Sequence, residues 1–330
     1  MTFMTKNNVT LEGIADLLRE RQRILLISHI RPDGDTLACA FALKSLLTEM
    51  GKTVICVSGD RVADRLAFIC DSEVLLPSEV SPDFKPDLVV SVDVASYSML
   101  GDCVSLMSLA ESIKIDHHES DDAFADHIYA DPKSASCSEI VFDLMNIMTE
   151  ELSDRVCSLL YTGISFDTGC FKHSNVTEAT HKKAAYLISR GIDASGINQK
   201  LFGNKSKKEI EALKLAYNSL EYFADGKIAM ICITNQMREE NGLSEDDIAE
   251  LAQIPIEING VLLGAVIKEK GDKPGHFKIS MRSHPGVSAA AACKRLGGGG
   301  HICAAGGLVT AESKEDAMQK VLEASLPEIN

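Results

Sequence analysis

Histidine and aspartate residues recur directly after short apolar segments of this sequence. They are His29, Asp33 and Asp35 after the segment 23–28, Asp93 after 88–92, and Asp116, His117 and His118 after 113–115. A further candidate, Asp167 in the glycine-flanked stretch 163–169, follows a helical pattern at 153–164. So many carboxylates in one place would repel one another unless cations neutralised them. Mixed carboxylate and imidazole ligands suit manganese or iron. Two such ions roughly 3.5–4 Å apart can activate a water and stabilise the leaving oxygen of a phosphoryl transfer.

The apolar segments that precede these residues are predicted to be strands of one parallel sheet. Runs at 23–28, 53–57, 88–92 and 112–115 alternate with helical patterns at 36–50, at 136–148 after the capping-box pair Ser136 and Glu139, and at 175–188. Open α/β sheets bind ligands outside the carboxyl ends of their strands, so the polar residues are expected to meet at one edge. Gly34 is expected to allow a tight turn that aims Asp33 and Asp35 at different ions.

The pattern changes after a charged helical stretch at 205–222. Strand-like segments at 227–234, 260–268 and 277–281 alternate with helical ones near 244–253, 287–295 and 313–325. The expected fold class is therefore α/β, with a parallel-sheet N-terminal domain joined by a helical linker to a smaller α/β C-terminal domain. The expected boundaries are 1–200 for a catalytic, metal-binding domain, 201–222 for the linker and 223–330 for a substrate-binding domain.

A second candidate site lies in the C-terminal part, in the stretch GGGGHICAAGG that begins at Gly297 and contains His301. Backbone N–H groups of a glycine run can approach a ligand closely and form an anion-binding concavity. Arg282 follows the predicted strand 277–281 and can present a planar guanidinium fork to phosphate. Most of the neighbouring lysines are expected to form a solvated face.

The composition is that of a globular protein and restricts its partners. The 330 residues are 45% hydrophobic and 25% charged, with a formal net charge of −15. No broad basic face for long nucleic acids is indicated, so a small anionic substrate is expected. Apolar runs of roughly 18 residues and a basic, then apolar, N-terminus are both missing from the sequence, which predicts a cytoplasmic protein without membrane contact. The ten cysteines form no CxxC pair, which argues against structural zinc or a disulfide framework.

Each candidate residue taken alone is also compatible with a structural role. An aspartate after a strand is often the N-cap of the next helix, and that is the commoner role for an isolated Asp33 or Asp35. Asp93 could cap a loop, and a lone histidine is usually a surface or hydrogen-bonded residue. The prediction of a metal site rests on the recurrence of the whole set at the ends of strands.

These motifs resemble those of the DHH phosphoesterase family over essentially the whole chain. Ser28-His29 with Pro32-Asp33-Gly34-Asp35 resembles the first motif, Val92-Asp93 the second, Asp116-His117-His118 the third, and Asp167 in its glycine-flanked setting the fourth. The segment 280–283 and GGGGHICAAGG resemble the DHH-associated C-terminal domain. The size and domain pairing are most similar to the compact NrnA-type branch of this RecJ-like superfamily. One departure is Ala38-Cys39, where the family more often has Gly-Ser.

The resemblance implies two bound divalent ions, with manganese as the expected metal. It implies that His29, Asp33, Asp93 and Asp167 ligate one or both ions, that Asp35 and His117 complete the second site, and that Asp93 is a bridge. His118 would face the scissile phosphate, with Asp116 as its supporting partner in catalysis. The residues that would bind the substrate are Arg282, Gly299, Gly300 and His301.

The implied activity is that of an oligoribonuclease, an exonuclease for very short RNA (nanoRNA, pApA), combined with a phosphatase for 3'-phosphoadenosine 5'-phosphate. Two alternatives are a cyclic-dinucleotide phosphodiesterase and a non-catalytic nucleotide-binding sensor. The GGGGH segment argues against a pyrophosphatase, and the chain length argues against a RecJ-type exonuclease. The resemblance also points to a homodimer, although no sequence feature demonstrates one.

Overall fold

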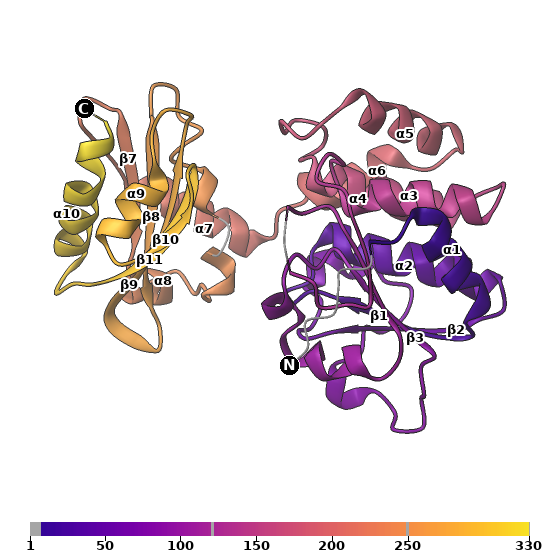
Figure 1. Ribbon diagram of the computed structural model, residues 1–330. Helices are drawn as coiled ribbons and strands as arrows, with labels where there is room; N and C mark the ends of the chain where they lie inside the picture. The colour runs from indigo at the N-terminus through magenta and orange to yellow at the C-terminus, as the bar shows by residue number, and fades with distance from the viewer. Residues whose placement is uncertain (1–7, 120–121, 249–250, 330) are drawn as a thin grey trace. The chain divides into compact units, whose positions relative to one another are not determined.

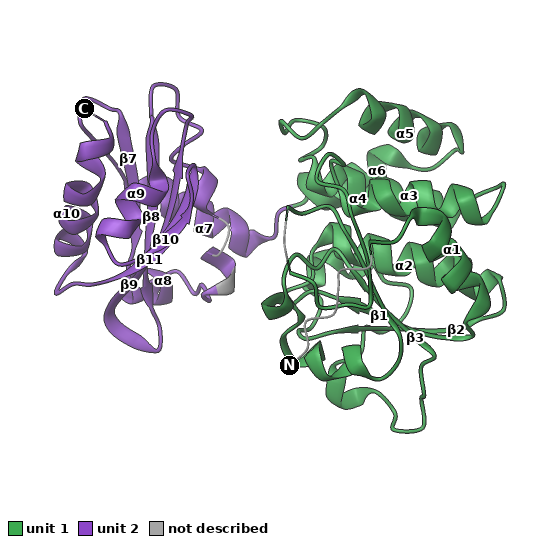
Figure 2. Ribbon diagram, viewed as in Figure 1, with its two compact units in different colours: residues 1–204 green, residues 205–330 purple. Residues whose placement is uncertain are grey.

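The computed structural model describes residues 8–119, 122–248 and 251–329 (Figure 1). The chain divides into two compact units, residues 1–204 (unit 1) and residues 205–330 (unit 2), which are coloured separately in Figure 2. Each unit is built around a sheet of its own, and the two units are described one at a time.

Unit 1 contains a five-stranded sheet in the order β2-β1-β3-β4-β5, with parallel pairing between neighbours. Its strands are β1 (Arg23–Ser28), β2 (Thr53–Ser58), β3 (Leu88–Val92), β4 (Ser112–Asp116) and β5 (His127–Ala130). The predicted parallel sheet is therefore confirmed. The strand order reverses between β1 and β3, and such a switch point is where open α/β sheets bind ligands.

Alternate residues of the central strands enter apolar cores on opposite faces of this sheet. Ile24 and Leu26 of β1 lie in the larger core, whose other members come mainly from α1 (Leu11–Glu20), α2 (Gly34–Glu49), α3 (Cys137–Met148) and α4 (Asp154–Asp167). Leu25 and Ile27 instead contact the 3-10 segment η3 (Tyr97–Ser108). Burial on both faces explains why the strands are apolar without interruption. The unit also contains η1 (Asp64–Ile69), η2 (Pro77–Glu79), α5 (Glu178–Ser189), α6 (Ala194–Asn198) and η4 (Gln199–Gly203).

Helix α2 begins where the chain leaves β1, and Asp33 is its N-cap. The Oδ1 atom of Asp33 accepts the N–H groups of Asp35 at 2.9 Å and of Thr36 at 3.1 Å, which satisfies two free donors of the first turn. The tight turn expected at Gly34 is not found, because Gly34 is already helical. A Cβ atom there would lie 2.5 Å from the ring of Phe166, so close packing of α4 against α2 explains this glycine.

Unit 2 contains a mixed sheet of six strands in the order β10-β11-β9-β8-β7-β6, in which β7 and β8 are parallel and the other pairs antiparallel. The strands are β6 (Leu220–Phe223), β7 (Ile228–Ile233), β8 (Leu263–Lys270), β9 (Lys273–Ser283), β10 (Gly299–His301) and β11 (Ala304–Thr310). The helices are α7 (Lys207–Asn218), α8 (Asn235–Glu240), α9 (Ala289–Arg295), α10 (Lys314–Ser325) and the 3-10 turn η7 (Leu326–Glu328). The predicted α/β class is thus confirmed for both units.

Two helices of unit 2 differ from the sequence-based prediction. The helix predicted over 205–222 ends at Asn218, and the residues after Ser219 form β6, which pairs with β7. The helix predicted over 244–253 is replaced by the 3-10 segments η5 (Asp246–Ile248) and η6 (Leu251–Gln253), while residues 249–250 lie outside the described residues.

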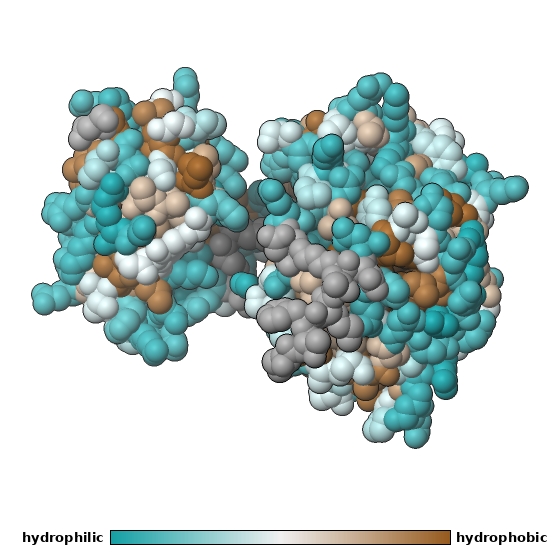
Figure 3. All heavy atoms as spheres, in the orientation of Figure 1, coloured by the Kyte–Doolittle hydropathy of each residue, from teal (hydrophilic) through white to brown (hydrophobic). Residues whose placement is uncertain are grey.

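Hydrophilic residues dominate the face of the molecule shown in Figure 3, with apolar residues in small patches between them. Among the described residues, no helix combines the length and the apolar character needed to cross a membrane. The ten cysteines are all free, and seven of them are buried. The seven buried cysteines therefore pack as small apolar side chains.

Candidate metal centre

His29 leaves the carboxyl end of β1 with its ring orientation fixed. Its Nδ1 atom donates to the carbonyl oxygen of Ile30 at 2.7 Å, which leaves Nε2 free to offer a lone pair. Nε2 lies 3.6 Å from Oδ1 of Asp33 and 3.8 Å from Oδ2 of Asp93. Asp33, the N-cap of α2, therefore also faces this imidazole. The same side chain can cap the helix and serve as a metal ligand.

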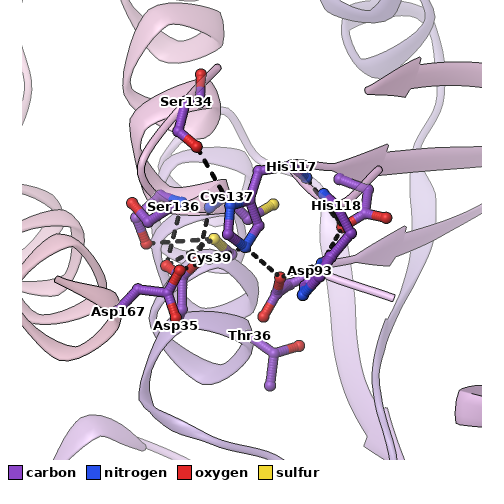
Figure 4. A network of polar contacts seen from close by, with 12 residues as sticks. Asp35, Thr36, Cys39, Asp93, His117, His118, Ser134, Ser136, Cys137 and Asp167 are labelled. Carbon is purple, nitrogen blue, oxygen red and sulfur yellow. Dashed lines mark hydrogen bonds and ion pairs between the residues drawn. The ribbon is translucent and has the colours of Figure 1, made fainter. Parts of the chain in front are cut away.

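His117 is oriented in the same way at the end of β4. Its Nδ1 atom donates to the carbonyl oxygen of Ser134 at 3.3 Å, and its Nε2 atom lies 3.3 Å from Oδ2 of Asp167 and 3.5 Å from Oδ1 of Asp93. Figure 4 shows His117 between Asp93 on one side and Asp35 and Asp167 on the other. A backbone acceptor that fixes the tautomer of an imidazole is typical support for a metal-ligating histidine.

Asp35 is held by the N-terminus of α3. Its Oδ2 atom accepts the N–H of Cys137 at 2.6 Å, and its Oδ1 atom accepts the N–H of Ser138 at 3.1 Å. Free N–H groups at a helix N-terminus stabilise a carboxylate. Helix α4 also comes so close that a Cβ atom on Gly163 would lie 2.5 Å from Oδ1 of Asp35.

Sequence reasoning missed the residues that hold Asp35. The capping signal at Ser136 correctly predicted where α3 begins, because the Ser136 hydroxyl accepts the N–H of Glu139 at 3.2 Å. That signal carries no information about which carboxylate the free amides of the first turn would meet.

Asp93 has an unusual backbone conformation and a buried side-chain oxygen. Its φ angle is +59°, in the left-handed region that few residues other than glycine adopt. The residue is 3% exposed, and within the described part of the chain its Oδ1 atom has no hydrogen-bond partner. Backbone strain and an unsatisfied buried carboxylate both cost free energy, and both cluster at functional sites. A cation between Asp93 and the neighbouring imidazoles would satisfy this oxygen.

The structure brings all six predicted ligands together. Among the described residues, potential ligand atoms form three groups, and the atoms of each group lie within 4.8 Å of one another. The groups are His29 with Asp33 and Asp93, Asp35 with His117 and Asp167, and Asp93 with His117 and with His118, which is not one of the six. Asp93 and His117 each belong to two groups. Two adjacent ions that share or approach these residues are therefore compatible with the geometry.

The electrostatics of the cluster also favour a cation. Burial and the negative charges of Asp35 and Asp33 raise the pKa of Asp93 well above its usual range, and the same causes raise the pKa of Asp167 to about 8. Burial likewise raises the pKa of Asp35. Without a metal, the cluster would hold protons in order to relieve this repulsion. Oxygen and imidazole donors together fit manganese or iron, so the residues present fit the predicted metal.

His118 belongs to one of these groups, whereas its partner Asp116 belongs to none of them. Nδ1 of His118 donates to Oδ1 of Asp116 at 2.8 Å. The same oxygen accepts the N–H of His117 at 2.9 Å. Asp116 is fully buried, whereas the His118 side chain is 43% exposed. The arrangement leaves the outer edge of the His118 ring free to contact a substrate.

In unit 2, Arg282 and His301 lie on the same face of the sheet. Both residues pair with Ala304 of β11, Arg282 from β9 and His301 from β10, and directly opposed residues on neighbouring strands point to one side. His301 is exposed. The Arg282 guanidinium donates to the carbonyl oxygen of Met281 at 3.0 Å.

The glycine run has a largely structural explanation. Gly297 has a φ angle of +75°, and Cβ atoms on Gly298 and Gly300 would lie 2.2 Å from the carbonyl oxygen of Gly306 and 2.7 Å from that of Ala304. These three positions require glycine for the turn into β10 and for its approach to β11. An added Cβ atom would have open space at both Gly297 and Gly299, but of these two only Gly297 has a positive φ angle, so Gly299 alone is free of both constraints.

Comparison with known families finds two matches that together cover most of the chain. Residues 23–164 match the N-terminal domain of the DHH family, and residues 225–327 match the DHHA1 domain. The first match, which ends at residue 164, includes five of the six clustered residues, and Asp167 lies three residues beyond it, at the end of α4.

Three similar proteins illustrate this relationship. The probable bifunctional oligoribonuclease and PAP phosphatase NrnA of Streptococcus mutans is 28% identical over 86% of this chain and 88% of that protein. An exopolyphosphatase-related protein from Bacteroides fragilis shares the fold with a TM-score of 0.86, at 23% identity over 96% of this chain and 95% of that one. An exonuclease RecJ bound to manganese has a TM-score of 0.53, at 13% identity over 100% and 96% of the two chains.

Proposed function

Because the chain belongs to the DHH phosphoesterase family, whose N-terminal and DHHA1 domains it combines, we propose that it is a manganese-dependent phosphodiesterase and phosphatase. Its proposed substrates are short oligonucleotides, such as nanoRNA and pApA, and 3'-phosphoadenosine 5'-phosphate. The proposal rests on the buried Oδ1 atom of Asp93, which accepts no hydrogen bond from the described residues. This oxygen lies 3.5 Å from Nε2 of His117 and 3.6 Å from Nδ1 of His118. An enzyme that binds two cations would use this oxygen as a ligand.

The choice of metal and substrate rests on chemistry and on relatives. The oxygen and imidazole donors suit manganese, which is also the ion bound in the RecJ structure of the same fold. The relative from Streptococcus mutans is named as a probable bifunctional oligoribonuclease and PAP phosphatase, and it is similar over most of both chains. The net charge of −15 further favours small nucleotides over long polymers.

The residues of the centre have distinct roles in this proposal. His29, Asp33, Asp93, Asp35, His117 and Asp167 would hold two cations. When bound, the cations supply an activated water and positive charge for the developing phosphate transition state. His118, held by Asp116, would contact the scissile phosphate through the exposed edge of its ring.

The proposed substrate contacts in unit 2 are Arg282, His301 and the backbone of Gly299 and Gly300. The shared face of Arg282 and His301 supports this assignment, because a guanidinium and an imidazole on one face can contact the same phosphate group. Replacing either side chain with alanine should raise the KM for a dinucleotide and leave manganese binding unchanged.

The proposal is tested by incubating the purified protein with manganese and a panel of phosphate esters. The panel contains pApA, RNAs of increasing length, 3'-phosphoadenosine 5'-phosphate, cyclic di-AMP and pyrophosphate. Turnover that is fastest with pApA and the shortest RNAs, and that also releases phosphate from 3'-phosphoadenosine 5'-phosphate, supports the proposal. Activity confined to cyclic di-AMP would instead indicate a cyclic-dinucleotide phosphodiesterase. Binding without turnover of any compound would indicate a nucleotide sensor.

Two variants link any activity to the centre. Asp93→Asn and His117→Ala should each abolish nearly all turnover, because each residue belongs to two of the ligand groups. His127→Ala is the matched control, since this half-buried histidine of β5 pairs with Glu111 and lies outside the cluster. Wild-type rates in Asp93→Asn would refute the assignment.

A further inference from the structure

Lys114 is a buried cation in the middle of β4. Lys114 is 1% exposed, and its neighbours on either side in the strand are apolar. The Nζ atom donates to the carbonyl oxygen of Ala95 at 2.9 Å and lies 5.0 Å from the centroid of the Phe124 ring. Burying an ammonium group is unfavourable unless a partner compensates its charge.

The partner of Lys114 is Asp116, at the end of the same strand. Side chains two residues apart in a strand point to the same face, and Nζ of Lys114 lies 3.2 Å from Oδ2 of Asp116. That oxygen accepts no hydrogen bond from any residue that the structure describes. The ion pair with Lys114 is therefore the interaction that compensates the Oδ2 side of this buried carboxylate.

The two oxygens of Asp116 thus face different groups. Oδ2 faces Lys114, whereas Oδ1 accepts from Nδ1 of His118 at 2.8 Å and from the N–H of His117. An ion pair that holds Oδ2 in place also fixes the plane of the carboxylate, and thereby the position of Oδ1. Because His118 donates to Oδ1, the position of this oxygen determines the orientation of the His118 ring. The three side chains form a continuous chain from the interior of the sheet to an exposed imidazole.

We propose that Lys114 is a positioning residue, which acts through Asp116 to hold the His118 ring in its orientation toward the substrate. The inference rests on the proposed phosphoesterase function for the role of His118, and it adds a residue that belongs to none of the metal-ligand groups. A purely stabilising role would not need this chemistry, because well-packed apolar side chains are often as stabilising as a buried ion pair.

A second buried lysine shows what a purely structural role looks like. Lys52 is 6% exposed, and its Nζ atom donates to the backbone carbonyl oxygens of Arg19 and Arg21. No carboxylate of the cluster is among these contacts. Lys52→Met is therefore the matched control for Lys114→Met, since both changes remove a buried ammonium and keep an unbranched side chain.

The first test is a double-mutant cycle with His118→Ala, measured with manganese and pApA. Lys114→Met should lower kcat by about 10- to 100-fold, as expected for a residue that orients a catalytic group, and should change KM by less than about 3-fold. In the His118→Ala background the same change should lower kcat by less than about 3-fold, because the group that it orients is gone. An equal loss in both backgrounds would overturn the proposal, and so would an unchanged kcat in Lys114→Met.

The second test separates positioning of His118 from damage to the metal centre. The manganese affinity of Lys114→Met, measured by calorimetry, should remain within about 3-fold of wild type, since its side chain contacts no proposed ligand. Lys52→Met should lose stability without a comparable loss of kcat. A larger fall in manganese affinity than in kcat would overturn the proposal, because Lys114 would then act on His117.

A third test does not depend on turnover. In a crystal structure of Lys114→Met, the His118 ring should have left Oδ1 of Asp116, and in Lys52→Met it should have kept this contact. A retained contact at about 2.8 Å in Lys114→Met would overturn the positioning role. If the wild-type protein hydrolysed no compound of the panel, the proposed function would fail, while this structural comparison would still decide whether Lys114 orients His118.

Discussion

The Oδ1 atom of Asp93 lies 3.5 Å from the Nε2 atom of His117, although the two residues leave the sheet from different strands. This separation is too long for a hydrogen bond. Two donor atoms that bind one ion at about 2.1 Å each are roughly 3–4 Å apart. The distance between these two atoms is therefore that expected of two ligands of the same cation.

Manganese should stabilise the protein through this pair. At a manganese concentration of about 100 times Kd, binding to the folded state alone adds about 2.7 kcal/mol to the free energy of unfolding. We expect a rise in Tm on adding manganese, a return on adding EDTA, and no rise in Asp93→Asn. The measurement is a thermal melt followed by circular dichroism, with His127→Ala as the control that keeps the full rise. A manganese-dependent rise in Asp93→Asn equal to that of wild type would contradict the site.

The metal-free protein should lose stability as the pH rises, because of Asp167. The pKa of this carboxyl is about 8 in the folded protein, whereas an unfolded aspartate titrates near about 3.9. Between these values the folded state holds a proton that the unfolded state releases. The contribution of Asp167 is thus fully present below about pH 4 and is lost as the pH rises through about 8.

Asparagine at position 167 cannot ionise, so the variant should escape this loss. Without metal, the Tm of Asp167→Asn minus the Tm of wild type should increase between about pH 5 and pH 9, because only the wild-type carboxyl titrates in this range. With manganese present, the wild type should have the higher Tm, since the ion then neutralises its carboxylate. A difference in Tm between the two metal-free proteins that stays constant with pH would show that the pKa of Asp167 is not raised.

Gly163→Ala should damage both stability and metal binding. The added Cβ atom would lie 1.9 Å from Oγ of Ser138 and 2.5 Å from Oδ1 of Asp35, so α4 must move away from α2 and α3. Overpacking of this kind typically costs about 1–3 kcal/mol. Urea denaturation should show that loss, and calorimetry should show weaker manganese binding.

The matched control for that change is Gly203→Ala. Its Cβ atom would meet only the flexible side chain of Gln199, at 3.2 Å, so both readouts should stay close to wild type. If Gly163→Ala bound manganese normally, Asp35 would not depend on the close approach of α4.

The glycine run offers a pair of neighbouring substitutions with opposite expectations. Gly300→Ala should lower stability by about 1–3 kcal/mol, because its Cβ atom would lie 2.7 Å from the carbonyl oxygen of Ala304. Gly299→Ala should change stability by less than about 0.5 kcal/mol. It should nevertheless raise the KM for pApA, since a methyl group would keep phosphate away from the backbone. An unchanged KM in Gly299→Ala would remove this glycine from the proposed substrate site.

The first strands were predictable because their apolar runs are unbroken and are followed by polar residues. Parallel strands place such residues at one edge, and the structure brings His29, Asp93 and His117 together there. The strand order that creates the switch point between β1 and β3 could not be predicted, because no local pattern determines which strands become neighbours.

Residues that act through tertiary contacts were the ones that sequence reasoning missed. Lys114 alternates with apolar residues, which is also the pattern of an exposed charge on a half-buried strand, and only the packing of Phe124 and Asp116 around it reveals a buried ion pair. Gly34 was expected at a turn, whereas the ring of Phe166 from a distant helix explains it. The end of α7 at Asn218 was missed because the apolar spacing continues into β6.

The carboxylate and imidazole cluster has a consequence for the order in which the protein is made. Its first member, His29, and its last, Asp167, are separated by most of unit 1, and the last lies at the end of α4. Chains are synthesised from the N-terminus and fold as they emerge. A nascent chain that has formed β1 to β4 still lacks a ligand until α4 has left the ribosome and packed against α2. A truncated product of translation that stops before α4 would therefore be unable to assemble the complete centre, even with its DHH motif in place.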